Sequence, residues 1–362
     1  MKKILFLLII IGSVKQSLSQ SRKVLLEEFT GAHCGQCPMG SYYVDSMCGK
    51  YPDLIAVAIH GYQPPDGMHV PDTDSLFTSY SAGAPLAAID RIYWGGSWTY
   101  VAQMQGAWDT CIQKRFLMPP DITLGIAPLI WTSSTRNIAA QVNIGILSNL
   151  PSGDYRISLY ITEDSVTGSG SGYDQVNFYN TSAGNPFFGM GNPIVGYVHK
   201  HVARTILPAS SWGLSGIIPT NPFAGQNFNY TFTYTLPSNY NENKIHLIAV
   251  VYRFTANHQG DEVLNAAEEK LLPLPNGINC SVENNGLFQI YPNPASGIFS
   301  IKNSDLTIET MQITTVMGDV VRKIEKGNSS LEINLSGEPR GIYFLKAADE
   351  KGNFVVRKIV LQ

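Results

Sequence analysis

Charged side chains are scarce in this sequence, and the two signs nearly balance. Asp, Glu, Lys and Arg make up 15% of the 362 residues, with 25 basic and 28 acidic side chains and a formal net charge of −3. Binding to a nucleic-acid backbone needs clustered Lys and Arg, and the sequence has no such stripe. We therefore predict no nucleic-acid partner, and acidic polymers are poor candidates.

Long apolar runs are missing beyond the first residues. A transmembrane helix needs about 20 apolar residues, so we predict no transmembrane segment. The chain opens instead with Met1-Lys2-Lys3, an apolar run over residues 4–11, and a small-x-small pattern at Ser17-Leu18-Ser19. This arrangement is typical of a secretory signal peptide, so we expect residues 1–19 to be removed and the mature chain to begin at Gln20.

Cysteine is sparse, and familiar catalytic signatures are absent. Five cysteines are too few for a disulfide-dense scaffold and odd in number for an exported chain. The sequence contains no nucleophile elbow, phosphate-binding loop or metalloprotease motif, and we expect no cofactor. Abundant Gly, Asn, Ser and Thr, together with 18 tyrosines, favour extracellular β-rich domains.

The pattern over residues 20–118 predicts a small α/β domain. Apolar runs and helical spacing alternate along this segment, and Pro119-Pro120 marks its end. Strands are expected at 24–29, 54–59 and 86–89, and helices at 39–47 and 100–116.

Beyond that boundary the apolar period changes to two, which predicts a β-sandwich of the immunoglobulin-like type over residues 119–275. The Gly- and Asn-rich stretch 167–192 is expected to be a long surface loop that is functional or mobile. A linker at 276–286 and a smaller β domain at 287–362 complete the expected organisation. The predicted fold class is therefore multidomain, α/β plus all-β.

The third domain carries an ordered set of short motifs. Ile-Tyr-Pro-Asn-Pro-Ala-Ser-Gly begins at Ile290, and a Gly-Asp hairpin, a Gly-Ile-Tyr-Phe-Leu strand and a final Arg-Lys-Ile-Val follow. This order resembles the type A sorting domain of type IX secretion in Bacteroidota. The resemblance implies a partner, the type IX secretion machinery, and export across the outer membrane to the cell surface or medium. The residues that carry it are Pro292, Asn293, Pro294, Gly297, Gly318, Gly341, Tyr343 and Lys358.

Cys34 and Cys37 lie where a predicted strand turns into a helix, the thioredoxin-type arrangement. The positive end of the helix dipole stabilises a thiolate there, so Cys34 would be the nucleophile and Cys37 the resolving partner. Glu28 matches the buried acid of thioredoxins in position, and Pro85 matches their cis-proline loop. The alternative interpretation is a structural disulfide.

The run Leu26 to Gly31, followed by the two cysteines, also resembles the twenty-eight-kilodalton outer membrane protein family of Bacteroidota. The resemblance continues through residues 197–204 and 247–252. It implies a thioredoxin-like domain paired with a β-sandwich at the cell surface. Two functions follow: binding of an unknown surface ligand or protein partner, or extracytoplasmic thiol–disulfide oxidoreduction by Cys34 and Cys37.

The remaining cysteines and histidines give weaker signals. Cys48 and Cys111 could pair or remain free thiols, and Cys280 is expected to be an exposed single thiol in the linker. His199 and His201 are two apart on a predicted strand and could hold a metal, but without a third ligand we expect a solvent-facing pair.

Two further groups of residues are candidates for ligand binding. Asp66, Asp72 and Asp74 lack the glycine and terminal glutamate of a calcium loop, so we expect a solvated loop. Trp94 and Trp98 share a short loop and could stack on a sugar or pack in the core.

Overall fold

The computed structural model describes residues 21–95, 100–272, 288–303, 308–315, 320–325, 330–349 and 354–362. The chain is mostly β and divides into two compact units, Met1–Pro273 and Leu274–Gln362. The expected signal peptide and linker lie outside the described residues. Within the described ranges, no helix is long and apolar enough to cross a bilayer.

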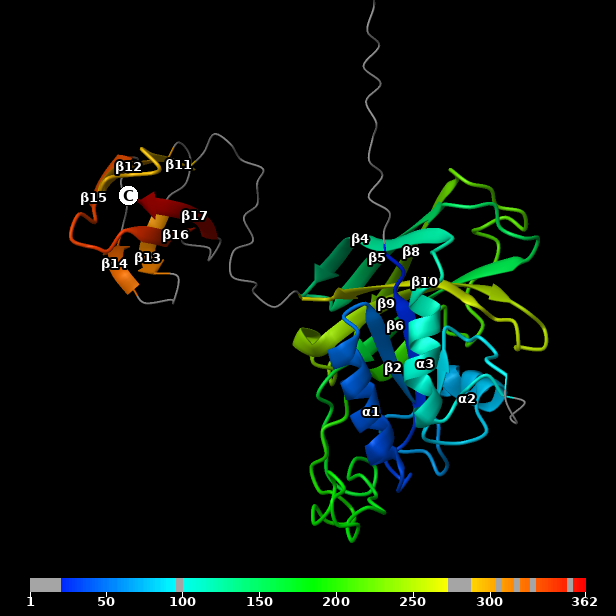
Figure 1. Cartoon of the computed structure of the whole chain (residues 1–362). Helices are drawn as coiled ribbons and strands as arrows, with labels where there is room; N and C mark the ends of the chain where they lie inside the picture. Colours follow the sequence, from blue (N-terminus) through cyan, green and yellow to red (C-terminus); the bar gives the residue numbers. More distant parts are fainter. Residues whose placement is uncertain are drawn as a thin grey trace, which may run out of the picture. The chain divides into compact units, whose positions relative to one another are not determined.

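A seven-stranded sheet is the centre of the first unit (Figure 1). Its order is β10–β9–β6–β7–β2–β1–β3, in which β1 pairs with β2 in parallel and with β3 antiparallel. Strands from the expected segments 20–118 and 119–275 therefore share one sheet. The strands are β1 Val24–Thr30, β2 Leu54–His60, β3 Leu86–Ile89, β6 Asp154–Glu163, β7 Val202–Leu207, β9 Ile245–Phe254 and β10 Val263–Lys270.

Helices cover both faces of the sheet around β1 and β2. On one face, α1 (Cys37–Lys50) and α3 (Gln105–Phe116) bury Val44 and Trp108 against alternate residues of these strands. On the other face, α2 (Asp74–Tyr80) buries its own apolar side chains. All seven residues of β1 are buried, as expected of a strand covered on both faces. The sequence did not predict α2, because it is short and follows a Pro-rich stretch.

The second sheet of this unit has the order β4–β5–β8, from β4 Ile122–Thr132, β5 Asn137–Ile146 and β8 Asn227–Thr235. Its inward side chains alternate along each strand, and they pack with residues of β6, β9 and β10 in one core. The period of two in the sequence reflects this two-layer packing.

A buried ion pair and two tyrosines join the helical part to the rest of the central sheet. The Arg91 guanidinium binds the Glu27 carboxylate at 2.7 and 2.8 Å, and the Tyr160 hydroxyl donates to the same carboxylate at 2.6 Å. Arg91 also lies 4.6 Å from the ring centroid of Tyr252. Because β1 supplies Glu27 while β6 and β9 supply the two tyrosines, this cluster spans the sheet.

The connection between β6 and β7, residues 164–201, is the longest loop of the first unit. It contains the Gly- and Asn-rich stretch expected as a surface loop, and it is held by isolated bridges between Val166 and His199 and between Gln175 and Ile194. The loop is the green trace at the lower end of the unit in Figure 1. It contacts the chain just before α1 through backbone hydrogen bonds to Ala32 and Gly35.

The second unit contains two small antiparallel sheets around one core. One sheet has the order β11–β12–β15 and the other β14–β13–β16–β17. The strands are β11 Phe288–Tyr291, β12 Ile298–Asn303, β13 Ile308–Thr315, β14 Val320–Glu325, β15 Ser330–Asn334, β16 Gly341–Asp349 and β17 Phe354–Leu361.

Candidate functional site

The cysteine pair lies at the turn between β1 and α1. Cys34 and Cys37 form a disulfide with a Cα–Cα distance of 5.3 Å, and Cys37 is the first residue of α1. The Cys37 N–H donates to the Cys34 carbonyl at 3.1 Å, which closes the turn. Cys34 is only 3% exposed and Cys37 1%. The sequence placed this pair correctly at a helix start, but the disulfide is buried.

Part of the β6–β7 loop covers the disulfide. The Val176 N–H donates to the Ala32 carbonyl at 2.8 Å, and the Phe178 N–H donates to the Gly35 carbonyl at 2.9 Å. The buried Gln175 amide donates to the carbonyl oxygen of Cys34 at 2.9 Å. We call residues 175–178 the cover segment. It satisfies the backbone of the cysteine turn and excludes solvent from the sulfurs.

Gly35 lets the cover segment approach closely. A Cβ atom at this position would overlap the ring of Phe178. The ring therefore lies directly on the backbone between the two cysteines, although 64% of Phe178 remains exposed. Any side chain larger than hydrogen at residue 35 would push the ring away.

Glu28 lies beneath the start of α1, on the same face of β1 as the helix. Burial, together with the nearby Asp45 charge, raises the pKa of its carboxyl to about 8. Its Oε1 atom has no hydrogen-bond partner among the described residues. A Cβ at Gly40 would overlap both this oxygen and Pro85, so the predicted supporting residues Glu28 and Pro85 both lie against Gly40 of α1. The peptide bond before Pro85 is cis.

A cavity of about 30 Å³ lies beside Glu28. Asp45, Tyr197 and Lys200 are among its lining residues. A cavity of this volume holds about one water molecule, and its polar lining residues could bind that water. The cavity lies beneath the residues 197–201 that close the β6–β7 loop, so the same loop covers the disulfide and closes this cavity.

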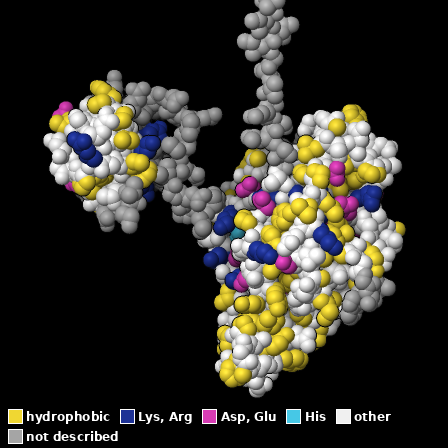
Figure 2. Space-filling view, viewed as in Figure 1, with side chains coloured by type: hydrophobic (Ala, Val, Ile, Leu, Met, Phe, Trp, Pro, Cys, Tyr) yellow, Lys and Arg dark blue, Asp and Glu magenta, His cyan; other side chains and the backbone are white. Residues whose placement is uncertain are grey.

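Apolar side chains gather on the surface around the cover segment. Figure 2 shows them over the end of the first unit where α1 begins and the β6–β7 loop lies. Rings from the two elements touch, since the centroids of Tyr42 and Phe187 are 6.5 Å apart. We use the name apolar surface for the exposed large apolar side chains of α1 and of the β6–β7 loop, which are Tyr42, Tyr43, Phe178, Phe188, Met190, Val195 and Val198.

In the second unit, the Pro-Asn-Pro motif is bound to the last strand. The side chain of Asn293, between Pro292 and Pro294, donates to the Lys358 carbonyl at 2.6 Å and accepts from the Val360 N–H at 2.9 Å. The asparagine amide thus takes the place of a neighbouring strand where the prolines offer no N–H. The motif is a structural part of this fold, joined to β17.

The other motif residues of the second unit have distinct roles. Gly297 has a φ of +113°, and a Cβ there would overlap Ser336, so only glycine fits. Tyr343 is buried and donates to the Pro339 carbonyl at 2.6 Å. Gly341 is the first residue of β16, while the side chain of Lys358 is exposed. Gly318 lies outside the described residues.

Two family models match the chain. The model described as outer membrane protein Omp28 matches residues 75–272, which is more than half of the sequence. The chain belongs to the Omp28 family. The model described as a secretion system C-terminal sorting domain matches residues 289–362. The Omp28-family chain is thus exported to the cell surface, the outer membrane or the extracellular space, and its sorting domain engages the secretion machinery.

Solved structures resemble this Omp28-family chain at low identity. HBP35 of Porphyromonas gingivalis aligns with 94% of this chain and 99% of its own, at 16% identity and a TM-score of 0.54. At this identity the likeness concerns the fold alone. A domain of the outer membrane lipoprotein Omp28 from the same organism covers 42% of this chain and 88% of its own, at 16% identity and a TM-score of 0.23. No curated protein matches the chain.

A buried histidine–aspartate pair adjoins the cysteine turn of this Omp28-family chain. His60 Nδ1 lies 2.7 Å from Asp66 Oδ2, which also accepts from the Ala32 N–H. Burial acts to raise the pKa of Asp66, but the His60 bond and charge and the backbone donors outweigh it and hold the pKa at about 2. The expectation of a solvated loop is therefore wrong for Asp66, whose side chain is 1% exposed.

The histidines expected as a solvent-facing pair occupy different environments. His199 is buried and lies 2.8 Å from the Tyr173 carbonyl, while His201 is half-buried and 3.6 Å from Asp164. Burial, with the neighbouring His60, lowers the pKa of His199 to about 4. The chain is not a strand here, because β7 begins at Val202. In the described part of the chain, no three His, Cys, Asp or Glu side chains are grouped so as to hold a metal ion.

Cys48, Cys111 and Trp94 are packed into the first unit. Cys48 and Cys111 are free thiols, and burial raises the pKa of both, that of Cys48 to about 12. Such thiols are poor nucleophiles. Trp94 packs against the core and donates to the Ile89 carbonyl at 3.3 Å, which agrees with the core interpretation. Cys280 and Trp98 lie outside the described residues.

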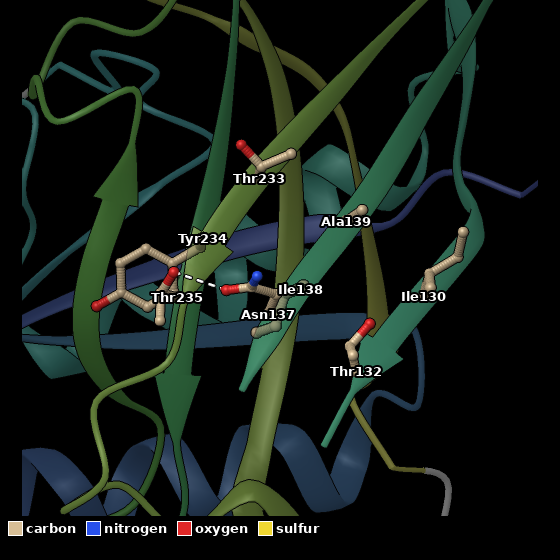
Figure 3. A pocket seen from close by; sticks show the side chains of 8 residues that line it. All are labelled: Ile130, Thr132, Asn137, Ile138, Ala139, Thr233, Tyr234 and Thr235. Atoms are coloured by element: carbon tan, nitrogen blue, oxygen red, sulfur yellow. Dashed lines mark hydrogen bonds between the residues drawn. The ribbon is translucent and has the colours of Figure 1, made fainter. Parts of the chain in front are cut away.

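A hollow of about 380 Å³ lies at one end of the β4–β5–β8 sheet. Its lining residues come from β4, β5 and β8, and Figure 3 shows the Thr235 hydroxyl donating to the Asn137 side chain beside it. The lining side chains are uncharged: Ile130, Thr132, Asn137, Ile138, Ala139, Thr233, Tyr234 and Thr235.

Sequence reasoning missed the residues that cover the cysteines. Gln175 and Phe178 lie in a stretch without apolar period, more than a hundred residues from Cys34. The length of this loop is the one signal that could have pointed to them, because long ordered loops tend to be functional. Nothing in the local pattern says which surface such a loop covers.

Proposed function

We propose that this protein acts at the cell surface by binding, and that the Cys34–Cys37 disulfide is a structural clip. The burial of both cysteines beneath the cover segment carries this proposal. Thiol–disulfide exchange requires an incoming thiolate to reach a sulfur atom. With Gln175 bonded to the turn and Phe178 lying on Gly35, an incoming thiolate has no open approach.

The proposed binding site is the apolar surface around the cover segment. Large apolar side chains gathered in one exposed area are typical of a protein–protein interaction site. Tyr42 and Tyr43 of α1 give this surface a rigid part, and the loop residues from Phe178 to Val198 give it an adaptable part. The disulfide and the hydrogen bonds of the cover segment would hold the two parts together.

Site-specific photocrosslinking on living cells would test this site. A crosslinker placed at Phe188 should yield a defined adduct with another surface protein. The same group at Leu147, which is also exposed but lies far along the chain from this loop, should not. Equal adducts from both positions, or none from Phe188, would count against a binding site on the apolar surface.

We further propose the expected domain organisation for the exported protein. It assigns residues 1–19 to a signal peptide, 20–118 to a thioredoxin-like part, 119–275 to an immunoglobulin-like β-sandwich, 276–286 to a linker and 287–362 to the sorting domain. The order β2–β1–β3 with α1 after β1 supports the thioredoxin-like part. The two packed sheets around one core support the sandwich.

The role of the sorting domain can be tested by deletion. Cells producing the chain without residues 287–362 should keep the protein inside the outer membrane. Surface-exposed protein would be measured by protease accessibility on intact cells. Unchanged surface delivery of the truncated chain would contradict the proposal.

Glu28 favours a second candidate, the thiol–disulfide oxidoreductase. A carboxyl with a pKa of about 8 beneath the cysteine turn is suited to exchange protons near neutral pH. We expect the disulfide to be structural and not redox-active, so wild type and Cys34→Ser should reduce insulin equally slowly. Faster turnover by the wild type would favour the enzyme.

The rate at which dithiothreitol reduces the disulfide separates the two candidates directly. A clip beneath a closed cover should react far more slowly in the folded protein than in urea. Gln175→Ala should speed the reaction, and Gln36→Ala, at an exposed position of the same turn, should not. Equal rates in folded and unfolded wild type would overturn the clip.

A further inference from the structure

The strand β8 is an open edge of the β4–β5–β8 sheet. It pairs with β5 along nine residues, and it has no other strand partner among the described residues. A sheet edge presents a row of unpaired N–H and C=O groups, which another strand can bind.

The register shows which backbone groups β8 leaves free. Arg136 accepts from the Leu236 N–H and Gln226 accepts from the Ile146 N–H, and both pairs continue the β5–β8 register. In an antiparallel ladder every second residue pair exchanges hydrogen bonds. Counting inward from these two pairs, the aromatic residues of β8 bond to β5. The residues whose N–H and C=O point to the free edge are Asn227, Asn229, Thr231, Thr233 and Thr235.

Other edges in the described part of the first unit carry features that discourage pairing. β4 contains Pro128 and an irregularity after Ile126. β10 ends in Glu268, Glu269 and Lys270, and β3 has only four residues. Proline, bulges, charges and shortness are the usual protections of a sheet edge. β8, with the sequence Asn-Phe-Asn-Tyr-Thr-Phe-Thr-Tyr-Thr, has none of them.

The sequence of β8 is also symmetric about Thr231. Aromatic residues stand one and three positions to either side, and uncharged polar residues stand two and four positions away. In an antiparallel pair of two such strands, aromatic side chains would oppose aromatic ones and polar would oppose polar. No like charges would meet, so the strand is complementary to a second copy of itself, as an isologous contact requires.

We propose that β8 pairs with β8 of a second copy of this chain, antiparallel, about a two-fold axis at Thr231. Thr231 opposes its own copy, Asn229 opposes Thr233, and Asn227 opposes Thr235. Each of these pairs has its backbone groups on the free edge, so the ladder closes with about ten hydrogen bonds. The two three-stranded sheets become one sheet of six strands.

The side chains near the edge fit this arrangement. Phe228, Tyr230 and Tyr234 are half-buried in the single chain and gain partners on the inner face. On the outer face, the partner's Asn227 reaches Thr235 at the rim of the hollow in Figure 3. Because this surface lies on β8 and not on α1 or the β6–β7 loop, its failure would leave the proposed binding function untouched.

Sedimentation equilibrium of the exported protein tests the dimer. The wild type should show a concentration-dependent equilibrium between monomer and dimer. Thr231→Lys places two like charges opposite each other, which should raise the dissociation constant at least about tenfold. Thr231→Glu should do the same, whereas an equal mixture of the two variants should restore dimerisation. Thr123→Lys, on β4 of the same sheet, is the control and should change nothing.

Hydrogen exchange of the Thr231 amide gives a second readout. It should slow as the wild-type concentration rises, and it should stay fast in Thr231→Lys. A wild type that remains monomeric overturns the proposal. A monomer with a protected Thr231 amide would show that a segment of the same chain covers the edge. A dimer that Thr231→Lys leaves intact would place the interface elsewhere.

Discussion

The cysteine turn and the β8 edge differ in how far other parts of the chain cover them, and their local sequences do not show this difference. The turn carries a reactive motif, but the cover segment fills its surroundings and leaves Cys34 only 3% exposed. The edge carries an ordinary alternating strand, but its outer backbone groups have no strand partner in the described residues. Whether a group can react or bind therefore depends on what packs over it, and distant parts of the chain decide that.

The largest expected effect comes from Glu28, the buried carboxyl beneath the cysteine turn. The pKa of Glu28 is about 8 in the folded chain against 4.5 for its ordinary value. Between these values the folded state binds more protons, so the free energy of unfolding falls as pH rises. Between about pH 5 and about pH 8, the ionisation of Glu28 should lower the free energy of unfolding by roughly 3 kcal/mol.

Urea titrations at several pH values would measure this effect. Glu28→Gln should remove that part of the pH dependence, whereas Glu269→Gln, at an exposed site, should keep it. An unchanged pH slope in Glu28→Gln would mean that the turn is more hydrated than its packing indicates.

A smaller effect is expected from Gly40→Ala in α1. The added methyl group would overlap Glu28 and Pro85, so the start of α1 must shift, at a cost of about 2 kcal/mol. Gly49→Ala in the same helix meets nothing within 4 Å and should be neutral or stabilising. Urea midpoints would measure both, and equal midpoints would argue against tight packing under the turn.

The hydrogen bonds of the cover segment should contribute less to the free energy of unfolding than the packing around Gly40 does. Gln175→Ala removes the donor to buried carbonyl oxygens of the cysteine turn and should lower the free energy of unfolding by about 1 kcal/mol. Gln36→Ala is the matched control. Chemical denaturation followed by tryptophan fluorescence would compare the two variants, and identical curves would show that the Gln175 bonds contribute nothing.

A substitution at the open edge should change the stability of the monomer least. Thr231→Lys alters an exposed side chain and should change the stability of the monomer by less than about 0.5 kcal/mol. The measurement is a urea titration at a concentration where the wild type is dissociated. A loss comparable to that of Gly40→Ala would mean that β8 is not an open edge, and the contrast would fail.

Local features of the sequence predicted the elements of both regions. Apolar runs placed β1, β2 and β3 to within one residue, and the period of two identified the strands of the second sheet. The turn with Cys34 and Cys37 was found because a strand ends and a helix begins within a few residues. The sorting domain was identified differently, because the order of its motifs resembles that of a known family, and the family model confirms it.

Long-range pairing was not predictable from the same signals. Nothing near Val202 indicates that β7 lies beside β2 and brings the helical part and the β-rich part into one sheet. The residues around Gln175 show no apolar periodicity that would indicate a contact with Cys34. The pairing of Glu27 with Arg91 likewise depends on β3 lying next to β1, which a single sequence does not specify.

The shared seven-stranded sheet has a consequence for the order in which this protein takes shape. β1 and β2 are made early, but their neighbour β7 belongs to a much later part of the chain. The helical part therefore lacks the neighbour of β2 until the chain has been made at least through residue 207. A fragment that ends at Pro119 would leave one side of β2 without its strand partner, so the first unit folds as a whole.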